Sequence, residues 1–361
     1  MEVEKNGTLS FARFMELALY DPEDGYYERP RQIGRGGDFY TSVSVGSLFG
    51  ELLAFQFAEW LDERGTQNAE HGKPTFQIVE AGAHDGRLAS DILNWFEKNR
   101  PEVFELLDYS ILEPSLCRRD WQRKTLAEFS KKVSWFDGWS DFPRSPFPVP
   151  SFKIVFSNEL LDAMPLHRLG WDAKEKRWFE WGVDWNGENF VWQRLAKIQD
   201  DLPLPQIAQE LLDVLPDGFT TEVCPNATRW WTEAAKNLES GKIIAIDYGL
   251  LAEEFFVPER SNGTLRAFSR HHASSDLLAR PGEQDLTAHV NFSALKNAGE
   301  IAGLKTETLI SQTRFLTGIA ERIWAKQNPF DEWDVSRRKQ FQTLTHPEHL
   351  GRAFRVLVQS R

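Results

Sequence analysis

The sequence predicts an α/β fold in which helices flank a doubly wound, mostly parallel sheet. From Thr75 onward, short apolar runs alternate with longer segments of helical periodicity, a pattern typical of a parallel sheet wound with helices. Two of the runs lead directly into an acidic residue, Glu80 and Glu113. With 361 residues, 41% of them hydrophobic, the chain is long enough for two or three lobes around a large core.

The first 70 residues differ from the rest, because they indicate helices and loops. An amphipathic helix is expected from Ser10 to Tyr20, with the serine as its N-cap. A glycine-rich loop over 34–38 precedes a second helix, Phe49–Arg64. Polar residues with Gly and Pro over 67–74 indicate a lobe boundary. We therefore expect residues 1–70 to form a helical N-terminal cap.

Residues 71–165 and 240–361 are expected to form the core around the sheet. A loop-rich stretch, Pro258–Asn291, interrupts the second part. The expected strands are Phe76–Val79, Tyr109–Leu112, Val133–Phe136, Ile154–Ser157, Lys242–Ile246, Thr306–Ile310 and Ala353–Val358, and the expected helices include Leu88–Phe96, Ser115–Phe129, Pro205–Leu215 and Ala227–Leu238.

Residues 166–239 are interpreted as an inserted lobe, containing a β-ribbon and helices, for a substrate or partner. Aromatic-rich runs at Trp178–Trp185 and Phe190–Leu195 flank Asn186-Gly187, a strong hairpin signal. The Trp-rich stretch from Trp171 to Trp192 suits recognition of a protein partner, since Trp anchors many interfaces. A ribbon that buries its own rings against the core is the alternative.

Composition excludes several classes of protein. The 54 acidic and 42 basic side chains leave a net charge of −12, which does not favour a nucleic-acid partner. The sequence has no apolar run near 18 residues and no apolar region at its start, so neither a membrane span nor a secretory signal is expected. Two cysteines, Cys117 and Cys224, fit reduced thiols in the cytoplasm. The eight histidines lack a His-Glu-x-x-His spacing, so no metal is expected.

The turn that follows the first core strand is the most informative short stretch. It passes from Glu80 through Gly82, His84 and Gly86 into a helix. Such a turn places backbone N–H groups and a carboxylate at the carboxyl edge of the sheet, where open α/β sheets bind ligands. An adenosyl-type ligand is expected, and the missing Gly-x-Gly-x-x-Gly pattern disfavours a nicotinamide enzyme. Glycine used only for steric relief is the alternative.

Candidate nucleoside-binding groups follow the next two strands. Glu113 can accept hydrogen bonds from both ribose hydroxyls, although it is also a favourable charge before a helix. The segment Asp137-Gly138-Trp139 can bracket an adenine ring with an aromatic side chain and a polar acceptor. An Asp-Gly turn is common in any protein, however.

Three polar residues, Asn158, Glu159 and Asp162, follow the fourth strand. Two carboxylates at a strand end can hold a cation, such as a guanidinium that needs bidentate partners. The alternative is a helix start, with Asn158 as the N-cap and the acids in the first turn.

A series of motifs along nearly the whole chain adds a family resemblance. They are 11–22, 25–27, 37–42, 48–51, 80–82, 158–165, 246–249, 263–267 and 285–292. In this order they resemble the MidA family of S-adenosylmethionine-dependent methyltransferases, whose mitochondrial members methylate an arginine of a respiratory complex I subunit.

The resemblance implies a class I methyltransferase-like fold with a seven-stranded sheet and S-adenosyl-L-methionine as cofactor. The implied donor-binding residues are Thr41, Ser42, Glu80, Gly82, His84, Gly86, Glu113, Asp137, Gly138 and Trp139. The loop over 38–42 would fold over the donor, as part of the cap. Asn158, Glu159 and Asp162 would face the reacting methyl as catalytic residues. The implied acceptor is an arginine of a protein substrate, and a homodimer is left open.

Two positions depart from the family pattern. The family usually has Gly where this chain has His84, and Pro-Glu where it has Val43-Ser44. A histidine at this turn can narrow the donor pocket, supply a hydrogen bond or weaken donor binding. A non-catalytic assembly or binding protein on a methyltransferase scaffold is therefore the alternative function.

Overall fold

The computed structural model describes most of the chain. The described residues are 2, 7–29, 41–65, 76–143, 152–269, 272–274, 276–326, 333–347, 350–351 and 353–361. The predicted lobe boundary over 67–74 and the loop residues 34–40 lie outside them. None of the helices in the described ranges has the length and apolar character that crossing a membrane requires.

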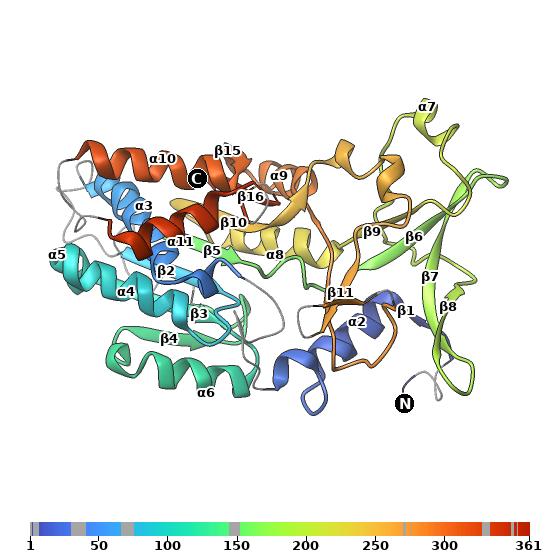
Figure 1. Ribbon diagram of the computed structural model, residues 1–361, viewed down its shortest axis with the longest axis horizontal. Coiled ribbons are helices and arrows are strands. Elements are labelled where there is room, and N and C mark those ends of the chain that lie inside the picture. Colours follow the sequence, from blue (N-terminus) through green and yellow to red (C-terminus); the bar gives the residue numbers. More distant parts are fainter. Residues whose placement is uncertain are drawn as a thin grey trace.

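The core is one twisted sheet whose main path has seven strands (Figure 1). In spatial order they are β15 (Lys305–Ser311), β16 (Phe354–Ser360), β10 (Gly241–Leu250), β5 (Phe152–Asn158), β2 (Phe76–Ala81), β3 (Leu107–Leu112) and β4 (Val133–Phe136). The strands from β10 to β4 are parallel, whereas β16 is antiparallel to both of its neighbours. A two-residue strand, β14 (Val290–Asn291), pairs with the end of β10. The predicted fold class is confirmed.

Both faces of this sheet are buried, which explains why its strands are apolar runs without alternation. In β5, Ile154 and Phe156 belong to one buried cluster and Val155 to another. The first face is covered by α3 (Leu48–Gly65), α4 (Arg87–Asn99), α10 (Gln312–Ala325) and α11 (Val335–Thr345), and the second by α8 (Pro225–Lys236) and α9 (Phe292–Ile301).

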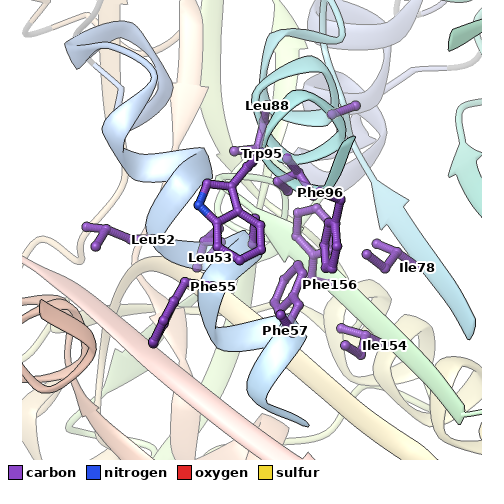
Figure 2. Close-up of a cluster of buried hydrophobic side chains, with 14 of the residues drawn as sticks. Leu52, Leu53, Phe55, Phe57, Ile78, Leu88, Trp95, Phe96, Ile154 and Phe156 are labelled. Carbon is purple, nitrogen blue, oxygen red and sulfur yellow. The ribbon is translucent and has the colours of Figure 1, made fainter. Parts of the chain in front are cut away.

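The larger cluster is aromatic where α3 and α4 meet the sheet. Figure 2 shows Phe57 and Phe96 beside Phe156 of β5, and the ring centroids of Phe57 and Phe156 are 5.4 Å apart. Trp95 lies edge-on to Phe55 at 6.2 Å. Burial of several large rings is a major stabilising contribution, and it fixes the helices that flank the carboxyl edge of β2.

A second, smaller sheet forms a lobe beside the core (Figure 1). Its strands are β1 (Leu9–Ser10), β6 (His167–Asp172), β7 (Arg177–Trp185), β8 (Phe190–Arg194) and β9 (Thr220–Val223). The predicted hairpin is confirmed, because Trp185 pairs with Phe190 across Asn186-Gly187. Trp171 and Trp178 are buried and lie edge to face at 5.1 Å, so these rings serve the lobe's own packing.

A three-stranded sheet lies between the lobe and the core. It consists of β11 (Arg266–Ser269), β12 (His272–Ser274) and β13 (Asp285–Thr287). These strands fall in the stretch predicted to be rich in loops, and they are too short to show a periodic pattern. The strands β6 and β9 were also absent from the prediction.

The N-terminal segment packs on two different parts of the molecule. The helix α2 (Phe11–Tyr20) begins as predicted, since the Ser10 hydroxyl accepts a hydrogen bond from the Arg13 backbone N–H at 3.2 Å. It contacts β6, β7 and β13, whereas α3 contacts α4, α10 and α11. The division of the chain into cap, core and lobe stays a prediction.

One predicted helix is largely wrong. Over Pro205–Leu215 only α7 (Gln209–Leu212) is helical, and Ala208 before it is extended. Prolines at 203, 205 and 216 restrict helix at this place. Leu211 and Leu215 of the stretch instead pack in a hydrophobic cluster with Phe219. The helix predicted over Ser115–Phe129 also ends early, with α6 (Leu116–Thr125) followed by a short 3₁₀ turn.

Candidate functional site

A cavity of about 840 Å³ lies at the carboxyl edge of the sheet. Its walls come from the ends of β2 and β5, from Tyr248 of β10 and from the sheet of β11 and β13. Seven of the predicted site residues line it, namely Thr41, Glu80, Gly82, His84, Asn158, Glu159 and Asp162. Segments far apart in the sequence therefore meet at one cavity, as expected for strand ends in a parallel sheet.

Two glycines shape the turn after β2. Gly82 has φ 75° and Gly86 has φ 84°, in the left-handed region that glycine enters without a steric penalty. A Cβ at Gly82 would lie 2.8 Å from Leu160 Cδ1, so the turn also packs closely on the segment that follows β5. Glycine at both positions has a steric reason, and Gly82 brings backbone to the cavity wall.

His84 shares the left-handed backbone of this turn, with φ 47°, a conformation that glycine adopts without a steric penalty. Its ring centroid lies 6.1 Å from that of Trp121 in α6. Its backbone oxygen accepts a hydrogen bond from Gln122 Nε2 at 3.0 Å. The side chain forms part of the wall of the cavity without filling it.

Glu80 is buried near the end of β2, at 2% exposure. Tyr109 Oη donates a hydrogen bond to Glu80 Oε2 at 2.6 Å. Burial raises the pKa of Glu80 to about 8, against the opposing effect of the tyrosine hydrogen bond. A cationic group that enters the cavity would favour the carboxylate form.

Glu159 has an uncommon backbone conformation beside the cavity, with φ 50°. Its Oε1 accepts hydrogen bonds from the Ser42 backbone N–H at 3.0 Å and from Asn158 Nδ2 at 3.1 Å. Desolvation raises the pKa of Glu159 to about 8. Such backbone conformations persist where surrounding contacts enforce them, often at functional sites.

Asp162 is buried close to other carboxyl groups. Desolvation raises its pKa well above the ordinary value, and Asp247, Asp285 and Glu159 add to the effect. Carboxylates crowded in this way favour either protonation or a bound cation. Glu159 and Asp162 therefore form an acidic wall of the cavity. Such a wall suits a cationic ligand.

The sequence alone did not single out Asp247, which holds this acidic wall in place. Its Oδ2 accepts hydrogen bonds from the backbone N–H groups of Leu160 at 3.2 Å and Leu161 at 2.9 Å, and its Oδ1 accepts one from Tyr248 N–H at 2.8 Å. Burial raises its pKa to about 7. The sequence carried one signal for Asp247, because this residue lies in the motif 246–249 of the family resemblance.

Several other polar residues of the cavity wall were likewise not predicted. They include Tyr27, Arg266, Asp285 and His289. Each lies in or beside one of the motifs of the resemblance, but nothing in the spacing showed that these motifs converge. Burial lowers the pKa of His289 to about 4, with nearby Arg260 and Arg266 adding to the effect, so its imidazole is neutral at pH 7.

Of the other predicted residues, Ser42, Gly86, Glu113, Asp137, Gly138 and Trp139 are not part of the cavity wall. Glu113 is buried and forms an ion pair with Arg118 at 2.8 Å. Asp137 is exposed and pairs with Arg119. Trp139 packs on Phe142 and Trp230. Their ribose and adenine roles stay predictions.

Comparison with known proteins now identifies the family. Residues 52–310 match a family model described as "Putative S-adenosyl-L-methionine-dependent methyltransferase". The chain belongs to this methyltransferase family. The predicted enzyme class and the predicted methyl donor, S-adenosyl-L-methionine, are thereby confirmed.

Solved structures and curated proteins resemble this methyltransferase along its whole length. A Burkholderia thailandensis protein crystallised with S-adenosyl-homocysteine is 31% identical, with a TM-score of 0.81 over 100% of this chain and 90% of that one. A second structure from this organism is 29% identical, with a TM-score of 0.79 over 100% and 89% of the two chains. The mitochondrial protein arginine methyltransferase NDUFAF7 of Homo sapiens is 28% identical over 98% of this chain and 80% of its own, and that of Xenopus laevis is 26% identical over 98% and 81%.

The residues of the methyltransferase cavity fit an adenosyl sulfonium donor. Gly82 brings backbone to the wall, and Glu80 supplies a carboxyl that can pair with a cationic group. Asn158 Oδ1 is buried and has no hydrogen-bond partner among the described residues, although such groups are usually satisfied. Family membership favours an enzyme over the alternative of a non-catalytic binding protein.

Proposed function

We propose that this methyltransferase transfers a methyl group to an arginine nitrogen of a protein substrate. The observation that carries the proposal is the acidic wall, in which Glu159 and Asp162 line the same cavity as the glycine turn. The naming of the NDUFAF7 relatives as protein arginine methyltransferases supports it.

S-adenosyl-L-methionine, when bound, supplies a sulfonium methyl that a neutral nitrogen can displace. Glu80, Gly82 and Thr41 would hold the donor from the β2 side of the cavity. Asn158, Glu159 and Asp162 would face the acceptor from the β5 side. Holding two reactants in line can lower the activation barrier by several kcal/mol. No covalent intermediate is needed for this effect.

The acidic wall would serve the acceptor in two ways. A guanidinium carries five N–H donors in a fixed plane, so carboxylates can attract it and fix its orientation. Its pKa above about 12 means that methylation releases a proton. The bound guanidinium favours the carboxylate form of Glu159, whose pKa is raised to about 8 in the free protein. This carboxylate can then take up the released proton as a general base.

The test is methyl transfer to identified arginines. The purified protein is incubated with isotopically labelled donor and candidate arginine-containing proteins, and the products are mapped by mass spectrometry. Label on arginine side chains supports the proposal. Label confined to other residues or to small molecules would contradict it.

Three finer statements stay predictions. The cytoplasm is the predicted location, while the curated relatives are named mitochondrial. A homodimer and a lack of nucleic-acid partners are expectations from the sequence alone.

A further inference from the structure

Three distant segments of the chain meet at the acidic wall. Besides the turn after β5, they are the 3₁₀ helix η1 (Tyr26–Glu28) and β13. Tyr27 and Asp285, one from each of these segments, line the cavity together with Glu159 and Asp162. In Figure 1, α2, which precedes η1, lies beside the small sheet that contains β13.

Hydrogen bonds join the three segments. Tyr27 Oη donates to Asp285 Oδ1 at 2.6 Å. The Ala288 backbone N–H, just beyond β13, donates to the backbone oxygen of Asp162 at 2.9 Å. Tyr20 Oη donates to the backbone oxygen of Ala163 at 2.9 Å. The position of the Asp285 carboxyl is therefore fixed relative to the acids that follow β5.

An aromatic pair packs on the N-terminal side of the cavity. Tyr20 and Tyr27 are stacked, with ring centroids 5.5 Å apart and an interplanar angle of 28°. Desolvation and the nearby Asp285 raise the pKa of Tyr27 well above its ordinary value, so its hydroxyl stays a hydrogen-bond donor. The phenol thus orients Asp285 through the hydrogen bond to its Oδ1.

Asp285 acts electrostatically on the predicted catalytic acids. It contributes to the raised pKa of both Asp162 and Glu159, and the three carboxyl groups line the same cavity. It is 3% exposed. Buried carboxyls that repel one another are costly unless a cation or protons neutralise them, and a planar guanidinium can hydrogen-bond to carboxylates on different segments at once.

We infer that Asp285 is an additional acceptor-binding residue, which hydrogen-bonds to the guanidinium of the arginine substrate, and that Tyr27 is its positioning residue. This inference rests on the proposed function. Asp285 would be the contribution of the small sheet to the acceptor site.

A thermodynamic cycle tests the inference. Binding of an arginine peptide that the wild type methylates, and of the same peptide with citrulline in place of the arginine, is measured by calorimetry with S-adenosyl-L-homocysteine present. Citrulline keeps the shape but removes the charge. For Asp285→Asn we expect the preference for arginine over citrulline to fall about tenfold, and the KM for the peptide to rise, with donor affinity unchanged. An unchanged preference would overturn the role of Asp285.

Tyr27→Phe provides a second measurement that does not remove the carboxyl. We expect a smaller rise in KM than for Asp285→Asn, again with donor affinity unchanged; a fall in donor affinity at constant KM would contradict a positioning role. Asp184→Asn is the matched control, because Asp184 accepts a hydrogen bond from Thr8 Oγ1 at 2.8 Å in the lobe, away from the cavity. A wild type that methylates no arginine would overturn the proposed function instead.

Discussion

Asp247 Oδ2 accepts a hydrogen bond from the backbone N–H of Leu161 at 2.9 Å, which ties the end of β10 to the turn after β5. The same oxygen accepts from Leu160 N–H. These bonds follow directly on Glu159, whose φ is 50°. A buried carboxylate thus holds the turn in the conformation that directs Glu159 at the cavity.

Asp247→Asn should destabilise the protein by about 1–3 kcal/mol, because an amide cannot accept at both positions and a buried N–H loses its partner. We also expect methyl transfer to fall, since the turn that carries Glu159 relaxes. Urea unfolding and initial rates measure the two effects. Asp217→Asn is the control, since Asp217 also accepts from a backbone N–H, that of Ala173 at 3.0 Å, but at an exposed site in the lobe. Equal effects of both changes would argue against a special role for Asp247.

Glu159→Gln should retain donor binding and lose about 10²-fold or more of the methyl-transfer rate, the usual range for removal of a general base. The amide keeps the shape and the acceptor oxygen for Ser42 N–H. Calorimetric titration with S-adenosyl-L-homocysteine and a single-turnover assay measure the two steps. Glu97→Gln, on the exposed face of α4, should change neither. Unaltered transfer would remove Glu159 from the catalytic residues.

Glu113→Gln tests the ribose assignment. If Glu113 binds the ribose, the affinity for S-adenosyl-L-homocysteine should fall about tenfold, because a charged hydrogen bond is replaced by a neutral one. The change also weakens the buried pair with Arg118, so the free energy of unfolding is measured in parallel. Lower stability with unaltered affinity would show that Glu113 serves only the fold.

His84→Gly tests whether the histidine obstructs the donor. Glycine removes the steric strain of the left-handed backbone conformation. It also removes the ring contact with Trp121 and makes the chain more flexible when unfolded. We expect these effects to offset one another, with donor affinity changed less than about threefold. Lys176→Gly is a control for the backbone effect, because Lys176 has φ 49° far from the cavity. A gain in donor affinity of about tenfold or more would mean that His84 narrows the pocket.

Raised pKa values make the stability of the free protein depend on pH. Glu80 and Glu159 have a pKa of about 8 when folded, against about 4.3 in an unfolded chain. Folding therefore favours the protonated forms. Their contribution to stability is complete below pH about 4, is lost as the pH rises to about 8, and changes no further above that pH.

Between pH 6 and pH 9 the melting temperature of the free protein should accordingly fall more for wild type than for Glu159→Gln. The reason is that the glutamine side chain has no carboxyl proton to lose. Differential scanning calorimetry at matched ionic strength measures the two curves. The Glu97→Gln variant should follow the wild type. Parallel curves for wild type and Glu159→Gln would contradict the raised pKa.

The sequence by itself determined the parallel core and part of the site. Apolar runs such as those around Ile78 and Ile154 predict strands buried on both faces, and in a parallel sheet their carboxyl ends share one edge. This local rule predicts that Glu80, Glu113, Asp137, Glu159 and Asp162 share that edge. In the structure Glu80, Glu159 and Asp162 line one cavity, whereas Glu113 and Asp137 do not. Turn chemistry likewise predicted the hairpin at Asn186-Gly187.

The tertiary structure alone decided which distant segments complete the cavity. Tyr27 and Asp285 are 258 positions apart, and no periodicity links them. Their hydrogen bond depends on how η1 and the small sheet pack against the turn after β5. The raised pKa of Glu159 was equally out of reach of the sequence, because desolvation depends on every neighbour that excludes water. Strand and turn propensities, in contrast, depend on adjacent residues.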